Sequence, residues 1–309
     1  MIDLTKCKLE PLRADDTFIL YRAHRADGAR SLLALVPRQP TIRSLEKLEN
    51  EYALAADLDP ACAVIPIELV PHKENMMLVL EDPGGESLAS LMENPLEFDA
   101  RLRLAVGLAD TVSRLHRHGL VHRDIKPGNI LVTEHDGARL TGFAHAVHKT
   151  QQSLAADVIA GTLPYIAPEQ TGRMNRPIDG RSDLYALGVT LYELFTGTLP
   201  FSASTPEEWI HCHVVRAPPS PTERTPDLPT QISVIVLKLL SKEPAGRYQS
   251  ADGLAADLKE CLAEWMARRQ IHCFTLGKYD AVTALRIPRT LYGRAPESAT
   301  LRAAFDRVV

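Results

Sequence analysis

The spacing of apolar residues predicts a strand-rich first part of the chain. Five runs carry the pattern: strands at 18–23, 31–36, 64–70 and 76–80, and one helix at 44–58. The first two strands flank a turn at Asp27-Gly28, so they are expected to form a hairpin. A break at Pro83-Gly84-Gly85 ends this pattern, and residues 1–82 therefore form one predicted unit.

Beyond the break, the apolar spacing becomes helical. A stripe between Leu102 and Leu115 predicts a long helix, with Asp99 as its N-cap and Gly119 as its stop. A second apolar helix is expected from 182 to 197. The segment between them contains a short strand at 139–141 and a long polar loop at 142–169. Residues 83–265 are therefore predicted to form a larger, mostly helical unit.

One polar stretch stands between the two predicted helices. Residues 121–132 read VHRDIKPGNILV, a loop stiffened by Pro127 and closed by an apolar strand. Asp124, Lys126 and Asn129 have the spacing that phosphoryl transfer uses. The acid accepts a hydroxyl proton, the lysine neutralises the moving phosphoryl group, and the asparagine holds a metal ion.

This stretch resembles the catalytic loop of protein kinases, and a lysine two residues after the aspartate is similar to the serine/threonine class. Residues 167–169, Ala-Pro-Glu, resemble the motif that closes a kinase activation loop. The resemblance implies that Asp183 braces the catalytic loop and that Arg247 pairs with Glu169. It also implies an α+β, two-lobed protein kinase fold, with a small β-rich N-lobe holding one main helix and a larger helical C-lobe.

The resemblance also places the nucleotide site, and there the sequence departs from the family pattern. The three positions of the glycine-rich loop hold Arg13, Asp15 and Phe18. Glycine allows a backbone to approach phosphates closely, and these side chains would intervene. The two aspartates at 15 and 16 would also put negative charge near the phosphates.

A second departure concerns the strand lysine that would pair with Glu51. Residues 9–46 contain no lysine, so Ala34 or Val36, depending on register, is expected in its place. Two arginines could substitute geometrically: Arg22 and Arg30.

Two more departures concern the metal and the adenine ring. Gly142-Phe143-Ala144 aligns with the metal-binding Asp-Phe-Gly motif, so the carboxylate is missing while the phenylalanine can pack against His122. The hinge position that donates a backbone N–H to adenine is Pro83, which has none. Glu51, Glu81 and Asn129 remain at nucleotide-binding positions, and Asn129 at a metal-binding one.

These observations predict a pseudokinase, a serine/threonine-kinase-like domain that acts as a regulatory or docking module in signal transduction without ordinary Mg-ATP binding. Asp124, Lys126 and Asn129 would then be retained but idle. Two alternatives stay open. One is an active, atypical serine/threonine kinase that uses ATP and magnesium, and the other is a scaffold that binds another small molecule between the lobes.

Composition narrows the partners. A net charge of -4 over 309 residues provides no general attraction to nucleic acid. No apolar run is long enough to cross a bilayer, and five cysteines without CxxC spacing suit a cytoplasmic protein with reduced thiols. A protein partner or downstream domains of the same chain are expected. Residues 266–290 are predicted to be a connector, and 291–309 resemble the entry to a bacterial STAND-class signalling ATPase.

Overall fold

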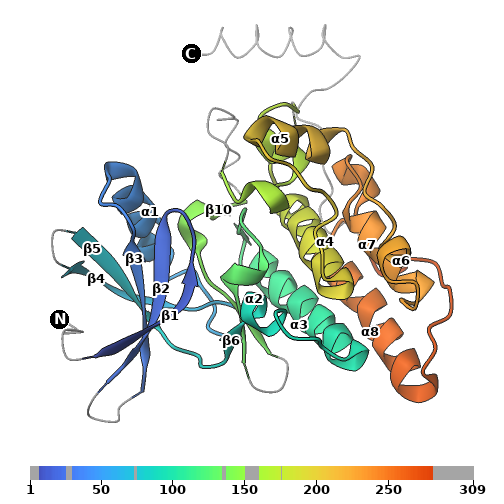
Figure 1. The fold of residues 1–309 in the computed structure, drawn as a ribbon, viewed down its shortest axis with the longest axis horizontal. Coiled ribbons are helices and arrows are strands. Elements are labelled where there is room, and N and C mark those ends of the chain that lie inside the picture. Colours follow the sequence, from blue (N-terminus) through green and yellow to red (C-terminus); the bar gives the residue numbers. More distant parts are fainter. Residues whose placement is uncertain are drawn as a thin grey trace, which may run out of the picture.

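The computed structural model describes residues 7–25, 30–72, 75–133, 137–149, 160–174 and 176–280. It has the predicted two-lobed α+β architecture, with a β-sheet and one long helix in the first lobe and packed helices in the second (Figure 1). The prediction of the fold class is therefore confirmed. Residues 281–309, including the predicted start of an ATPase domain, lie outside the described residues.

The N-lobe contains a five-stranded antiparallel sheet with strand order β1-β2-β3-β5-β4. Its strands are β1 (Lys8–Ala14), β2 (Phe18–His24), β3 (Leu32–Pro37), β4 (Pro66–His72) and β5 (Asn75–Glu81). The sequence pattern did not predict β1, because this edge strand is mostly exposed and includes charged residues and a proline. Its pairing with β2 is interrupted by a β-bulge between Pro11 and Arg13.

Helix α1 (Ile42–Ala53) packs against this sheet. A reciprocal cap starts it, since the Ser44 N–H donates to Thr41 Oγ1 at 3.1 Å and the Thr41 N–H donates to Ser44 Oγ at 3.0 Å. The helix is shorter than the predicted 44–58. Leu54 and Leu58 continue the apolar pattern, but they pack into the core of the C-lobe after the helix has ended.

The C-lobe is built on seven α-helices and five short strands among the residues described. The helices are α2 (Leu88–Leu91), α3 (Phe98–Arg117), α4 (Gly180–Thr196), α5 (Pro206–Val214), α6 (Pro221–Arg224), α7 (Thr230–Leu239) and α8 (Ala251–Arg268). The strands are β6 (Glu86–Ser87), β7 (Leu120–Val121), β8 (Ile130–Val132), β9 (Ala138–Leu140) and β10 (Val147–His148). Helix α3 begins after Glu97, so the expectation that Asp99 caps it was wrong. Asp99 instead accepts a hydrogen bond from Trp265 Nε1 at 2.5 Å, which ties α3 to α8.

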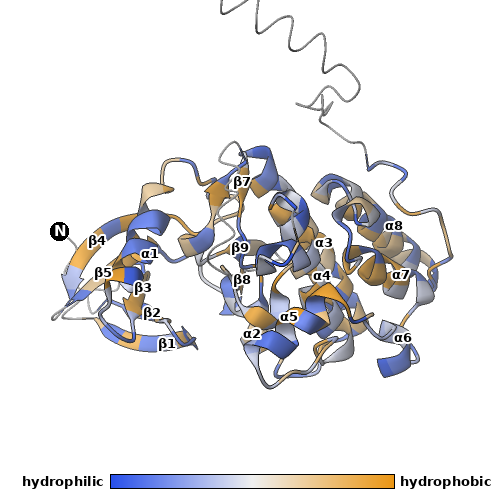
Figure 2. Cartoon of the chain, turned by 90° about the horizontal axis from the view of Figure 1, so that it is seen from above, coloured by the Kyte–Doolittle hydropathy of each residue, from blue (hydrophilic) through white to orange (hydrophobic). Residues whose placement is uncertain are grey.

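Helix α4 forms the centre of the C-lobe core. Thirteen of its residues are buried, and it ends as predicted at Gly197, whose φ of 72° is accessible to glycine at little cost. Figure 2 shows hydrophobic residues concentrated in the strands of the sheet and in the packed helices of the large lobe. The loop between β7 and β8, which contains the predicted catalytic residues, lies on these packed helices.

The chain folds back after α8. The Asp280 carboxylate accepts hydrogen bonds from the Gln249 and Ser250 backbone N–H groups at 2.7 and 2.9 Å, next to the start of α8. The part of the predicted connector that the structure describes is therefore packed against the C-lobe. None of the described helices combines the length and the apolar character needed to cross a bilayer.

Candidate nucleotide and catalytic site

Helix α4 anchors the loop between β7 and β8. The Asp183 carboxylate accepts hydrogen bonds from the backbone N–H groups of His122 and Arg123, both at 2.8 Å, and from His116 Nε2 at 2.9 Å. Burial alone would raise the pKa of Asp183, but these donors hold it below its usual value. Asp183 is thus an ionised anchor, in the position the sequence predicted.

The three residues predicted to act in catalysis lie together. Asn129 Nδ2 donates to Asp124 Oδ2 at 2.9 Å, and Lys126 Nζ lies 3.5 Å from the same oxygen. Lys126 also donates to Thr162 Oγ1 at 2.7 Å, and the Thr162 N–H donates to Asp124 Oδ1 at 2.7 Å. The segment around Thr162 therefore contacts the catalytic loop, and its N–H group occupies one carboxylate oxygen of Asp124.

The predicted ion pair of the C-lobe is also present. Arg247 binds Glu169 through two hydrogen bonds, of 2.7 and 2.9 Å, and the two side chains are 0% and 1% exposed. Ser182 Oγ donates to the same carboxylate at 2.7 Å. This network joins the end of the long loop, α4 and the segment after α7, so it contributes to the fold whether or not the domain is active.

The Gly-Phe-Ala segment lies against α1. Phe143 is fully buried, and its ring centroid lies 4.7 Å from that of His122, as the packing prediction required. Gly142 has a φ of +78°, and a Cβ added there would lie 2.9 Å from Asn129 Oδ1. A side chain at this position would need both a strained backbone and a displaced Asn129.

Glu51 of α1 projects into the same region without a cationic partner. Its side chain is buried, and neither carboxylate oxygen makes a hydrogen bond within the described part of the chain. Burial raises the pKa of Glu51 to about 7, although Arg13 and the backbone N–H groups of 142–144 act in the opposite direction. Lys47, one turn earlier in α1, lines the same cavity, but the Glu51 oxygens accept no hydrogen bond from it.

The residue in the place of the strand lysine is Leu35, so the expectation of Ala34 or Val36 was wrong. Leu35 lines the cavity together with Glu51, and it packs in the same apolar cluster as Leu48 of α1. Ala34 points to the opposite face of the sheet, since side chains alternate along a strand.

Neither arginine considered as a substitute reaches Glu51. Arg22 binds the Asp82 carboxylate through hydrogen bonds of 2.7 and 3.1 Å and donates to the Gly85 carbonyl oxygen at 2.9 Å. It thereby fastens β2 to the hinge. Arg30 is exposed on the strand connection. Among the residues described, neither arginine therefore makes the substitution that the sequence left open.

The hinge end of the cleft is filled by apolar side chains. Leu33, Leu80 and Leu131, from β3, β5 and β8, are at most 1% exposed and belong to one cluster that joins the two lobes. Glu81 ends β5 with its side chain exposed, and its N–H donates to the Ile65 carbonyl oxygen at 2.9 Å. A role for Glu81 at the nucleotide site stays a prediction.

The other end of the cleft is a polar cavity of about 350 Å³. Its lining includes Arg13, Lys47, Glu51, Asp124, Lys126 and Trp209. Arg13 Nη1 donates to Asn129 Oδ1, the oxygen expected to hold a metal ion, and to the Gly128 carbonyl oxygen at 3.0 Å. Magnesium needs oxygen ligands. Here the Asn129 oxygen is bound to the Arg13 guanidinium, and Gly142 has no side-chain carboxylate. The residues present do not fit a magnesium ion as the family pattern would require.

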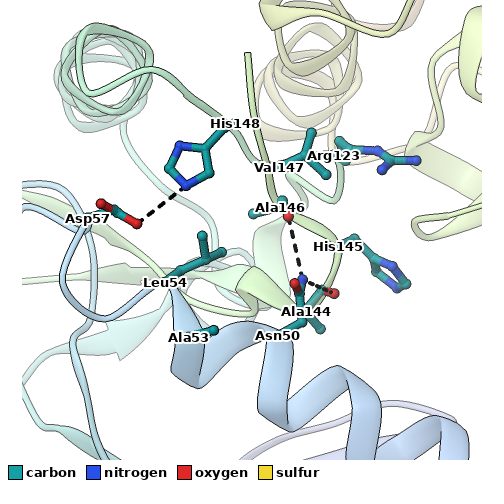
Figure 3. A pocket seen from close by; sticks show the side chains of 10 residues that line it. All are labelled: Asn50, Ala53, Leu54, Asp57, Arg123, Ala144, His145, Ala146, Val147 and His148. Atoms are coloured by element: carbon teal, nitrogen blue, oxygen red, sulfur yellow. Dashed lines mark hydrogen bonds and ion pairs between the residues drawn. The ribbon is translucent and has the colours of Figure 1, made fainter. Parts of the chain in front are cut away.

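A second cavity, of about 360 Å³, lies behind α1 (Figure 3). Asn50 Nδ2 donates to the Ala144 carbonyl oxygen at 2.9 Å, and His148 Nε2 lies 3.3 Å from Asp57 on the other side of this cavity. These contacts dock α1 onto the start of the activation-loop-like segment. They hold Glu51 in the cleft even though it has no lysine partner.

The sequence pattern did not reveal the positions of Arg13 and Lys47. Arg13 appeared as an obstacle at a glycine position, and its partner lies 116 residues away. Lys47 could have been found from its spacing, because residues i and i+4 share a helix face and Lys47 precedes Glu51 by four.

Comparison with known proteins gives a consistent result. Residues 35–258 match the model of the protein kinase domain. The chain is 30% identical over 255 residues to a probable serine/threonine-protein kinase of Streptomyces coelicolor, covering 79% of this chain and 38% of that protein. It is 33% identical over 215 residues to a probable serine/threonine-protein kinase of Clostridium acetobutylicum, covering 69% and 32%. It is 30% identical over 249 residues to serine/threonine-protein kinase PknB of Mycolicibacterium smegmatis, covering 77% and 39%. The chain thus spans well under half the length of these relatives.

Proposed function

Because the chain belongs to the protein kinase family, with serine/threonine kinases among its relatives, we propose that this domain is a pseudokinase that acts as a regulatory or docking module in signal transduction. The observation that carries the proposal is the environment of Glu51. Its family role is to hold a lysine against the phosphates, and the cavity presents Leu35 to it instead. A buried carboxylate without a cation cannot organise a nucleotide phosphate.

The missing contacts to ATP and magnesium would cost much of the free energy of nucleotide binding. A hydrogen bond to a charged group contributes about 1.5–3 kcal/mol, so losing the strand lysine and the metal carboxylate removes about 3–6 kcal/mol. Millimolar to micromolar binding corresponds to about -4 to -8 kcal/mol in total. The adenine end adds to this deficit, because Pro83 stands at the hinge position and has no N–H to donate.

The retained triad supports a second candidate, an active but atypical kinase that uses Mg-ATP. Asp124, Lys126 and Asn129 lie within hydrogen-bonding or ion-pairing distance of one another. Lys47 also reaches the cavity, although burial and the neighbouring Arg43 lower the pKa of its amine against the opposing charges of Asp15 and Asp124. In that case Asp124 would accept the proton of a protein hydroxyl group. A scaffold role toward another small molecule rests on the 350 Å³ cavity alone.

A phosphate-transfer assay distinguishes these functions. The purified domain is incubated with labelled ATP, magnesium and a generic serine/threonine substrate, beside Asp124→Asn. We expect no transfer from either protein, and Asp124→Asn should still melt cooperatively, with a loss of about 1–3 kcal/mol because the hydrogen bond from Asn129 and the ion pair with Lys126 are both lost. Transfer by the unmodified domain that disappears in Asp124→Asn would establish the active alternative.

The proposal also includes the localisation of the domain, its partners and the domain boundaries. We place the domain in the cytoplasm, with a protein partner or downstream domains of the same chain as its target. The N-lobe is assigned to 1–82, the C-lobe to 83–265, the connector to 266–290, and the start of a STAND-class ATPase to 291–309. A pull-down of residues 1–265 with separately expressed residues 266–309, beside an unrelated peptide of equal length as the control, tests this arrangement.

A further inference from the structure

The turn between β1 and β2 places two charged side chains against the catalytic loop. In a regular antiparallel pair, successive residues point to opposite faces of the sheet. The β-bulge between Pro11 and Arg13 changes the register, so Arg13 lies opposite Leu20. Leu12 and Leu20 both contact the apolar cluster beneath the sheet, and Arg13 also reaches toward this side. The bulge thus turns two successive side chains toward the cleft.

Arg13 occupies the cation position of the cleft. Its Nη1 donates to Asn129 Oδ1 and to the Gly128 carbonyl oxygen at 3.0 Å, and its side chain is only 9% exposed. A Cβ at Gly128 would lie 3.2 Å from Arg13 Cδ, so the loop has little room to spare along this side chain. A planar, permanently charged guanidinium is well suited to two oxygen acceptors at once.

Asp15 provides the complementary negative charge. Its Oδ1 accepts hydrogen bonds from the Thr17 and Phe18 N–H groups at 2.9 and 2.8 Å, which fixes the turn around the carboxylate. Its Oδ2 lies 3.7 Å from Lys126 Nζ and 3.9 Å from Arg13 Nη2. Lys126 is the residue whose family role is to neutralise a phosphoryl group. Here its nearby anions are two carboxylates of the protein itself, Asp15 and Asp124.

We infer that the β1–β2 turn is an internal ligand of the catalytic loop, with Arg13 in place of a metal ion and Asp15 in place of a phosphate oxygen. The two side chains hold the front of the cleft closed in the absence of nucleotide. The inference deepens the proposed function and rests on it, because Mg-ATP could occupy this place only by displacing both groups. A domain closed in this way presents one fixed surface to its partners.

Hydrogen exchange on the full chain tests the inference through Arg13→Ala. We expect the amides of Thr17 and Phe18 and those of the loop at 128–131 to exchange roughly tenfold faster than in the unmodified protein. The matched control is Arg22→Ala, which also removes an arginine–aspartate contact from β2 but leaves the catalytic loop untouched. Unchanged exchange at 128–131 in Arg13→Ala would overturn the inference.

A second variant covers the case in which Arg13→Ala fails to fold. Asp15→Asn keeps an oxygen for the two turn N–H groups and removes only the charge that Lys126 and Arg13 face. It should increase exchange at the same loop amides by a smaller factor, and exchange identical to that of the unmodified protein would count against an electrostatic role for the turn.

The same measurement separates the two proposals. Protection of the unmodified protein by Mg-ATP would contradict the proposed function. Unchanged loop exchange in Arg13→Ala, with no effect of Mg-ATP on the unmodified protein, would contradict only the internal-ligand inference.

Discussion

Leu35 and Glu51 both line the interlobe cavity, so the carboxylate of α1 shares it with an alkyl side chain where the family places an ammonium group. The helix is nevertheless docked against the C-lobe, through Asn50 and the backbone of the segment at 144–146. Closure of the helix and readiness for phosphate binding are therefore separate properties in this domain. The first is retained, and we propose that the second has been lost.

Glu51 should make stability depend on pH. Its pKa is about 7 in the folded protein and 4.5 ordinarily, so the folded state binds more protons between these values. The resulting stability is fully present below about pH 4.5 and is lost as the pH rises through 7, a change of about 3 kcal/mol. In denaturant titrations from pH 5 to 8, Glu51→Gln should remove this slope. The exposed Glu49→Gln in the same helix should keep it, and equal slopes in all three proteins would show that Glu51 is not buried as described.

The Arg247–Glu169 pair should dominate the stability of the C-lobe. Removing one partner of a buried ion pair costs about 3–5 kcal/mol, so Arg247→Ala should lower the melting temperature strongly. The matched control is Lys259→Ala, whose pair with Asp110 is 54% and 40% exposed and is worth about 0–1 kcal/mol. If calorimetry gave the two variants similar losses, the buried network would not support the fold as we describe.

The register of β3 predicts the position at which a substituted lysine would reach Glu51. Leu35→Lys places an amine beside Glu51, so the pH dependence assigned to Glu51 should weaken as the carboxylate becomes ionised. Ala34→Lys is the control, because that side chain is fully buried on the other face of the sheet and should only destabilise the fold. The reverse outcome in denaturant titrations would show that the register is wrong.

Adding Gly142→Asp to Leu35→Lys supplies the missing metal ligand, but the positive φ and the nearby Asn129 should limit the gain. A magnesium-dependent response to ATP should return only when Arg13→Ala is also present, since Arg13 occupies Asn129 Oδ1. Titration calorimetry on the double and triple variants measures this difference. Equal responses from the two proteins would show that Arg13 does not block the metal position.

The features that the sequence predicted best are those encoded by local motifs. The spacing of polar residues indicated the catalytic loop, and the resemblance to kinases located its anchor, Asp183. The pair of Glu169 with Arg247 spans 78 residues, yet both lie in family motifs, so the resemblance located it. In these cases the residue type and its neighbours in sequence were enough.

The features that were missed depend on register and on long-range contacts. Strand β3 is apolar on both faces, so its sequence carries no alternation to show that Leu35 rather than Ala34 faces the cleft. The β-bulge that turns Arg13 toward Asn129 leaves no such signal either. Glu81 ends β5 with an exposed side chain, and its part in nucleotide binding stays a prediction.

The central claim concerns nucleotide binding, and a thermal-shift titration of the unmodified domain with ATP, with and without magnesium, tests it most directly. A ligand at about 100 times its Kd adds about 2.7 kcal/mol of stability, so micromolar binding would be evident at millimolar concentration. We predict that millimolar Mg-ATP leaves the melting temperature unchanged. A clear rise that requires magnesium would contradict the account.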